Sequence, residues 1–186
     1  MGRTIKYTCS SCGKPHEEWP ALSFDSPTSY AVLPEKIKQN IGELSSDFCI
    51  VQHSEQTDRF IRATLTIKVV DHCEDLAYGL WVSLSEKSFQ DYADNFHNPN
   101  HETTYFGWLS NDIPEYDVIE SIPTTVFTRP DNHRPEIIPH KDFDHPLVYD
   151  YYNGITKIDA EKRINEMVKA IYERDKVKPK PWWKLW

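Results

Sequence analysis

The sequence predicts an α+β fold, with a mainly antiparallel sheet and two to three flanking helices. Strand-like segments group together in the middle of the chain, and the helical patterns lie at the margins of these groups instead of alternating with them. A chain of 186 residues with 39% hydrophobic and 27% charged residues is long enough to bury one core. We therefore predict a single domain over residues 1–174, with a zinc-knuckle-like turn at about 5–20 and a tail at 175–186.

Seven segments have the alternating or β-branched character of strands. The first is residues 4–8, and an antiparallel meander is expected from 47–52, 59–70 and 76–85. In the middle member of this meander, Ile61, Ala63, Leu65 and Ile67 alternate with polar positions, which is typical of a half-buried strand. Further strands are predicted at 103–110, 124–129 and 135–139, because clusters of Asn, Asp and Pro separate these segments.

Three segments have helical periodicity. Residues 34–44 start with Pro34 at a suitable first helical position and repeat apolar residues on one stripe. Ser85 can cap a second helix over 86–96, whose apolar residues recur at helical spacing. The most regular pattern is at 156–175, where Thr156 and Asp159 can cap an amphipathic helix.

Charge and hydropathy limit the partners and the compartment. The formal net charge of −8 repels phosphate backbones, so we expect no nucleic-acid partner. The longest apolar runs are far shorter than the ~20 residues that cross a bilayer, and the N-terminus lacks a signal-peptide core. We expect a cytoplasmic protein without integral membrane association, in which the four cysteines stay reduced.

The stretch "CSSCGKPH" at residues 9–16 has the spacing of a metal-binding turn. In such a turn Cys9 and Cys12 direct two sulfurs at one point, and Gly13 tolerates the backbone that brings amides toward them. His16 can supply a third ligand. A redox CxxC would need a helix after the pair, and "GKPHEEWP" does not continue as one. We therefore predict bound zinc.

The fourth zinc ligand must come from elsewhere in the sequence. Cys49 completes the predicted set of Cys9, Cys12, His16 and Cys49, although its apolar neighbours also fit a thiol buried in a core strand. Cys73, His145 and water remain alternatives. A second CxxC pair, which would identify a zinc site more specifically, is absent from the sequence.

Several catalytic motifs are absent. The six glycines are too widely separated for a phosphate-binding loop or a dinucleotide fingerprint. Neither GxSxG nor HExxH occurs, so the serine hydrolase and zincin templates do not apply.

The segment "YFGWLSNDIPEY" at residues 105–116 is rich in the residue types that anchor protein interfaces. The same aromatic side chains can instead complete the core of their own domain. Together with a histidine from a later polar segment, they form the predicted interaction surface: Tyr105, Trp108, Asn111, Tyr116 and His145.

Taken in order, "YTCSSCGKPH", "SDFCIV", "FIRATLTIKV", "YGLWVSLSEKSF", "YFGWLSNDIPEY" and "DHPLV…NGI" resemble the bacterial family called domain of unknown function 2199. The resemblance covers about residues 5–170. It implies a bacterial, intracellular, single-domain protein and supplies no catalytic residues. The positions that match the motifs of the family are Cys9, Cys12, Gly13, His16, Cys49, Gly107, Trp108, His145 and Pro146.

Two functional hypotheses follow. The first is a metal-stabilised binding or interaction protein, whose acidity suits a basic partner such as a toxin or a nucleic-acid-binding enzyme, as in an immunity-like role. The second is a zinc-dependent enzyme, a hydrolase of unknown substrate, with an open metal position. Its ligands would be Cys9, Cys12 and His16 or His145, and its acid, base or hydrogen-bonding groups would come from Asp47, Asp144 or Asn111.

The C-terminal "KVKPKPWWKLW" contains three of the six tryptophans. Prolines at 179 and 181 favour an extended segment, so Trp182, Trp183 and Trp186 do not fit a helical core stripe. We expect this tail to dock on its own domain or remain disordered. A partner or a membrane interface is the alternative.

Overall fold

The computed structural model describes residues 6–8, 15–116, 121–131 and 133–177. Cys9, Cys12 and the three tail tryptophans lie outside these ranges, and so does the side chain of His16. The helices are α1 (Thr28–Ala31), α2 (Glu35–Ile41), α3 (Glu86–Asp94), α4 (Pro146–Asn153) and α5 (Lys157–Val177). The strands are β1 (Lys6–Thr8), β2 (Pro15–Glu17), β3 (Leu22–Ser23), β4 (Gly42–Leu44), β5 (Phe48–Gln52), β6 (Thr57–Ile67), β7 (Leu76–Leu84), β8 (Thr104–Leu109), β9 (Pro123–Phe127) and β10 (Glu136–Pro139).

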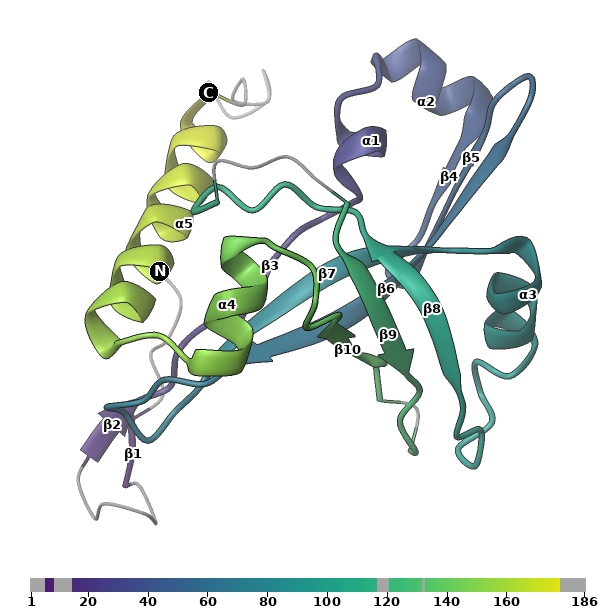
Figure 1. The fold of residues 1–186 in the computed structure, drawn as a ribbon. Coiled ribbons are helices and arrows are strands. Elements are labelled where there is room, and N and C mark those ends of the chain that lie inside the picture. Colours follow the sequence, from purple (N-terminus) through teal and green to yellow (C-terminus); the bar gives the residue numbers. More distant parts are fainter. Residues whose placement is uncertain (1–5, 9–14, 117–120, 132, 178–186) are drawn as a thin grey trace.

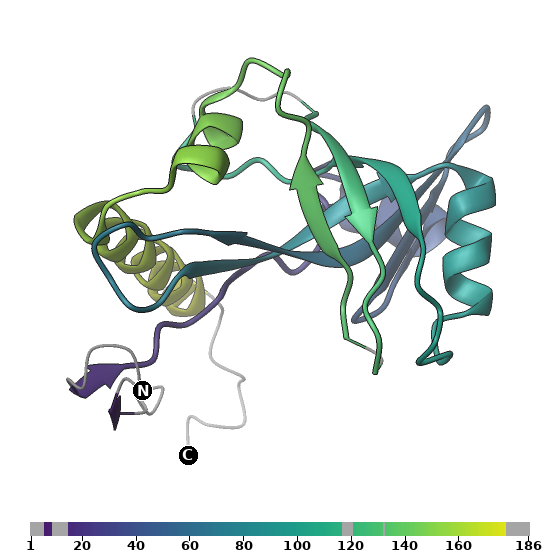
Figure 2. The same ribbon diagram turned by 60° about the horizontal axis from the view of Figure 1, so that its bottom comes forward.

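Strands β6 to β10 curl into a barrel (Figures 1 and 2). Each pairs antiparallel with the next in chain order, and β10 then pairs with β6 through Glu136 and Thr64. This last pairing is parallel, because in an antiparallel series of five strands the first and fifth run in the same direction. The predicted α+β class is confirmed, and the sheet is a mixed barrel.

Shorter strands extend the barrel on both sides. β5 pairs with the first half of β6, and β4 pairs with β5, both antiparallel. β3 pairs parallel with β7, at Leu22 and Ser23. β1 and β2 form a separate hairpin, so the predicted first strand is present. The predicted knuckle turn itself falls in residues 9–14, outside the described ranges.

The main core fills the barrel and the space under three helices. The apolar positions of β6 that alternate in the sequence, such as Ile61 and Leu65, are buried. α3 buries Phe89 and Tyr92 against the same core, and α4 and α5 lie on the opposite side of the barrel strands (Figures 1 and 2). A second, smaller cluster lies under α1 and α2 and contains Cys49, Val51, Phe60 and Trp81.

The structure changes the expected helices in two places. The helix predicted over 34–44 ends at Ile41, and Gly42–Leu44 form β4, because Gly42 takes extended backbone angles and pairs with Val51. Pro34 precedes the first helical residue instead of occupying that position. α1 and α4 were not expected, because each is too short to show a helical repeat.

Candidate functional site

The outer faces of β8, β9 and β10 form one surface that is rich in exposed aromatic side chains. Strand register aligns their outward-facing residues in three rows. Because alternate residues of a strand point to opposite faces, the outward positions can be read directly from this register. The rows are Trp108, Pro123 and His140; Phe106, Thr125 and Ile138; and Thr104, Phe127 and Glu136. We call these nine residues the outer face.

Aromatic side chains dominate the outer face. Phe106 is 51% exposed, Trp108 42% and Phe127 37%. Phe106 contacts the ring of Trp108 edge to face at 5.2 Å between centroids, and it contacts His140 at 5.6 Å. Thr125 Oγ1 lies 3.2 Å from His140 Nε2, so a hydrogen bond holds this imidazole on the surface. The side chains are thus mutually supported although they remain exposed.

Gly107 keeps the strand beneath the aromatic pair close to its neighbours. A Cβ at this position would lie 3.1 Å from both Ser83 O and Val126 Cγ2. Gly107 occupies an inward position of β8, so its neighbours Phe106 and Trp108 project outward on either side of it. In Figures 1 and 2 none of the helices that the structure describes crosses the outer side of β8, β9 and β10. Glu136 is the only acidic residue among the nine outer-face residues.

The structure separates the five predicted interaction residues. Trp108 lies on the outer face, whereas Tyr105 and Asn111 are buried. Asn111 Oδ1 accepts from Trp81 N at 2.7 Å, and Asn111 Nδ2 donates to Ser26 O at 2.9 Å. Tyr105 donates to Asp91 Oδ2 at 2.6 Å. Burial and this hydrogen bond to a carboxylate raise the pKa of Tyr105, so its hydroxyl stays protonated.

Tyr116 and His145 are also buried. Tyr116 donates to Asp150 Oδ2 at 2.8 Å and accepts from Arg163 Nη1 at 2.7 Å. Burial raises the pKa of Tyr116 despite the opposing charge of Arg163. His145 Nδ1 accepts from Leu147 N at 3.1 Å and caps the start of α4. Both side chains therefore fix α4 and α5 on the barrel.

Comparison with models of known protein families identifies the family of this chain. The family model of uncharacterised proteins conserved in bacteria, DUF2199, matches residues 8–155. The chain belongs to DUF2199. The matched span of this DUF2199 protein includes β2 to β10 and α1 to α4, and it ends before α5. Comparisons with curated proteins and with solved structures find no match.

The described part of this DUF2199 chain contains no group of three His, Cys, Asp or Glu side chains arranged to hold a metal. Cys49 is completely buried, and burial raises its pKa to about 12, so its thiolate is disfavoured. Cys73 is exposed. Zinc binding through Cys9, Cys12 and His16 stays a prediction. None of the described helices is long and apolar enough to cross a bilayer.

The groups expected to act in a zinc enzyme are also dispersed. Asp47 Oδ1 accepts from Arg134 Nε at 2.6 Å, and Asn111 holds the backbone of β7. Asp144 is exposed directly before the α4 cap. These three residues therefore occupy different parts of the DUF2199 fold.

The sequence analysis missed most of the outer face of this DUF2199 protein, including Phe106, Phe127, Ile138 and His140. A usable signal was present in the alternation of residues 104–109. If Tyr105 and Leu109 point inward, then Phe106 and Trp108 must point outward on the same strand. The density of aromatic residues in a segment does not distinguish the two faces of a strand, whereas their alternation does.

Proposed function

We propose that this protein is an interaction domain that binds a basic partner protein through the outer face. The observation that carries the proposal is the exposed aromatic group formed by Phe106 and Trp108 of β8 and Phe127 of the adjacent strand β9. Contiguous exposed apolar surface of this kind marks interaction sites, and Trp anchors are enriched among residues that dominate binding.

Charge favours a basic partner. The chain has a formal net charge of −8, whereas the outer face itself carries a single carboxylate, Glu136. An apolar centre surrounded by an acidic protein combines desolvation at the contact with long-range attraction of a cationic protein. A basic toxin, or a basic enzyme that acts on nucleic acid, has this chemistry, and the domain would then act as its inhibitor or immunity partner.

The partner can be captured by photo-crosslinking in cells. We expect p-benzoylphenylalanine at position 106 to yield a discrete adduct with one basic protein, identified by mass spectrometry. The same group at position 158, which is 76% exposed at the start of α5, is the control and should not give this adduct. An adduct formed equally from both positions, or one that contains two copies of this chain, would contradict the proposal.

The captured protein then allows a quantitative test with purified components. Trp108→Ser should weaken its binding by about 30-fold, because removal of a central aromatic anchor costs about 2 kcal/mol. Ile158→Ser also removes a large exposed apolar side chain and serves as the matched control. Equal affinities of the two variants would exclude the outer face as the binding surface.

We also propose that zinc stabilises the N-terminal segment, with Cys73 as the fourth ligand beside Cys9, Cys12 and His16. Trp19, two residues after β2, contacts the turn that contains Cys73. The Trp19 ring stacks on His72 at 4.4 Å, and Trp19 N donates to Glu74 Oε1 at 3.0 Å. β5, which carries Cys49, lies at the opposite end of the molecule from β2 in both ribbon views.

Metal analysis of single cysteine variants separates the two thiols. We expect about one zinc per chain in the wild type, and loss of most of it in Cys73→Ser, because a tetrahedral site needs each thiolate. Cys49→Ser should keep its zinc. The double variant Cys9→Ser/Cys12→Ser should contain none. Retention of zinc in Cys73→Ser together with its loss in Cys49→Ser would reverse this assignment.

A further inference from the structure

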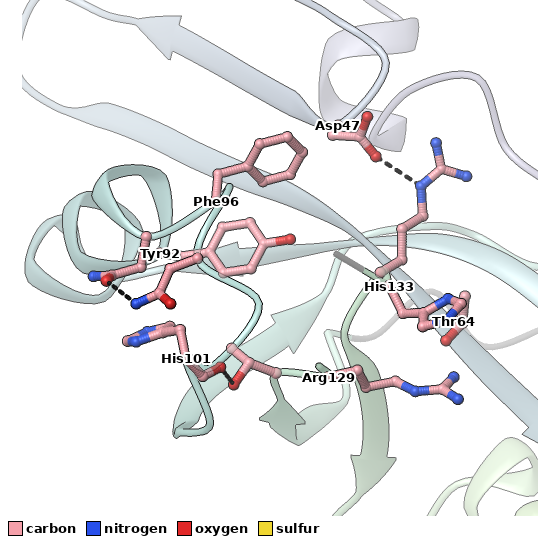
Figure 3. Close-up of a pocket in the computed structure, with 11 residues that line it drawn as sticks. Asp47, Thr64, Tyr92, Phe96, His101, Arg129 and His133 are labelled. Carbon is pink, nitrogen blue, oxygen red and sulfur yellow. Dashed lines mark hydrogen bonds and ion pairs between the residues drawn. The ribbon is translucent and has the colours of Figure 1, made fainter. Parts of the chain in front are cut away.

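A pocket of about 450 Å³ lies where β6 changes its partner. β5 pairs with β6 as far as Ile61, and β10 joins the same edge of β6 at Thr64. The pocket opens beside this junction, between the end of α3 and the connection from β9 to β10 (Figure 3). Its volume is within the range of small-molecule sites, about 300–1,000 Å³.

One ion pair spans the junction. Arg134 Nε donates to Asp47 Oδ1 at 2.6 Å and so joins the start of β10 to the start of β5. Burial alone would raise the pKa of Asp47, but hydrogen bonds from Arg134 and Ser46 and the charges of Arg134 and Arg62 lower it. Asp47 is therefore ionised at neutral pH. It holds the Arg134 side chain along one wall of the pocket, and no acceptor among the described residues contacts the terminal nitrogens of the guanidinium.

The other donors of the pocket come from separate elements. Figure 3 shows Tyr92 and Phe96 on one side and Arg129 and His133 on the other. No acceptor from the described residues contacts the Tyr92 hydroxyl or the Arg129 guanidinium. Burial, with the charge of Asp47, raises the pKa of Tyr92 to about 12, so this hydroxyl stays a donor. Within the described part of the chain, α3, the segment after β9 and the segment before β10 thus each present a donor that has no acceptor.

The remaining hydroxyl groups of the lining are already engaged. Thr64 Oγ1 donates to Pro135 O at 3.2 Å, and Thr128 Oγ1 donates to His101 O at 2.7 Å. The His101 ring lies 2.9 Å from the Tyr105 hydroxyl and 3.4 Å from Asp91. These contacts hold the walls of the pocket in place. The lining side chains that can bind a ligand are then those of Tyr92, Arg129, His133 and Arg134.

We propose that this pocket binds the phosphate group of a small ligand through Arg129, Arg134 and Tyr92. Among the lining residues that the structure describes, two guanidinium groups oppose one carboxylate, so this part of the lining is cationic in a protein of net charge −8. Guanidinium groups suit phosphate oxygens. A tetrahedral phosphate can accept from donors on three walls, whereas a planar carboxylate has two oxygens. The site is distinct from the outer face and does not depend on the proposed interaction function.

Isothermal titration calorimetry at low salt, with inorganic phosphate as the probe, tests the site. Arg129→Gln should weaken phosphate binding by at least about tenfold, because it removes charge-assisted hydrogen bonds. Tyr92→Phe keeps the buried ring and removes only the hydroxyl, so we expect a loss of about three- to tenfold. Arg59→Gln is the control, because Arg59 contacts Glu86 outside the pocket. Its affinity should equal that of the wild type.

Each other outcome counts against the proposal. Wild-type protein that gives no binding heat with phosphate in the millimolar range would overturn it, as would equal affinities of Arg129→Gln and Arg59→Gln. Acetate that binds as tightly as phosphate would show that any small anion is accepted and would overturn the phosphate assignment. The melting temperature of each variant, measured in parallel, identifies a loss of affinity that comes from unfolding.

Discussion

At the scale of single residues, the structure uses several interface-type side chains to satisfy its own backbone. Asn111 is the clearest case, because it joins two segments that are far apart in the sequence. Its carbonyl accepts from the buried Trp81 N–H of β7, and its amide donates to Ser26. A buried backbone group without a partner costs free energy comparable to a lost hydrogen bond. Asn111 therefore contributes to stability and not to an exposed surface.

Asn111→Ala should lower the free energy of unfolding by about 2 kcal/mol, because it leaves the Trp81 N–H buried without an acceptor. Urea denaturation followed by circular dichroism measures this change. Asn40→Ala, at an exposed position of α2, is the control and should change stability by less than about 0.5 kcal/mol. If the two variants were equally stable, the Asn111 hydrogen bonds would have no net stabilising effect.

At the scale of elements, the described side chains of α5 attach it to the barrel through polar contacts as well as apolar ones. Ala160 is completely buried, whereas Ile164 and Met167 are only partly buried. Arg163 forms an ion pair with Asp150, in which Nη2 lies 2.7 Å from Oδ2. Its guanidinium also lies 5.1 Å from the centroid of the Tyr116 ring. This ion pair is largely shielded from water, so it attaches α5 to α4 and to the core.

Arg163→Met should lower stability by about 3 kcal/mol, because it leaves Asp150 largely buried without its charged partner. Hydrogen exchange should show faster exchange in α5 and little change in β6 and β7. Lys162→Met, one position earlier, is the control, because the Lys162 side chain is 71% exposed and lies 3.9 Å from Glu166. Uniform acceleration across the whole domain would mean that α5 does not open separately.

The start of α3 gives a second test at this scale. Ser85 Oγ accepts from Ser88 N at 3.2 Å, as the sequence predicted for a helix cap. Ser85→Ala should cost about 1 kcal/mol, and Ser85→Asp should keep most of the stability, because aspartate is an equally good cap. Thermal and urea unfolding measure both. A variant Ser85→Asp that loses as much stability as Ser85→Ala would contradict the capping role.

Sequence patterns identify some helices and strands of this fold but not others. β6 follows from alternation, because Ile61, Ala63, Leu65 and Ile67 face the barrel interior. β7 is buried on both faces over most of its length, so its signal is a short apolar run and not alternation. α2, α3 and α5 follow from apolar repeats and caps. α4 was missed because its eight residues span only about two turns and its cap is His145, which is not among the usual capping residues.

At the scale of the whole molecule, the barrel could not be predicted from local patterns. Its closure depends on the pairing of Glu136 with Thr64, which is a contact between distant parts of the chain. Alternation identifies the two strands but not which strands become neighbours. The outer face and the phosphate pocket both follow from this closure, so the candidate sites were less predictable than the elements that build them.

Alkaline unfolding is the prediction that concerns the whole fold. Burial raises the pKa of Cys49 from 9.0, and those of Tyr78 and Tyr92 from 10.0, to about 12. In the unfolded chain these groups lose their protons first, so their contribution to stability is complete below about pH 9 and is lost between about pH 9 and pH 12. Urea midpoints should fall over this window.

Tyrosinate absorbance measured in parallel should show a late group that ionises together with unfolding. Tyr78→Phe removes one of the raised groups and should make the decline of stability with pH less steep. A folded protein in which all tyrosines ionise near pH 10 would contradict this prediction.

The parallel contact between β6 and β10 also affects how the protein is made. Thr64 and Glu136 are separated by 136 − 64 = 72 residues, so the barrel cannot close until most of the chain has been synthesised. Before that point, the part of β6 that later pairs with β10 has an unpaired edge, and such edges can pair with other chains. Contacts of high sequence separation also slow folding. A nascent chain that stalls before residue 136 is therefore expected to depend on chaperones more than one that ends after β10.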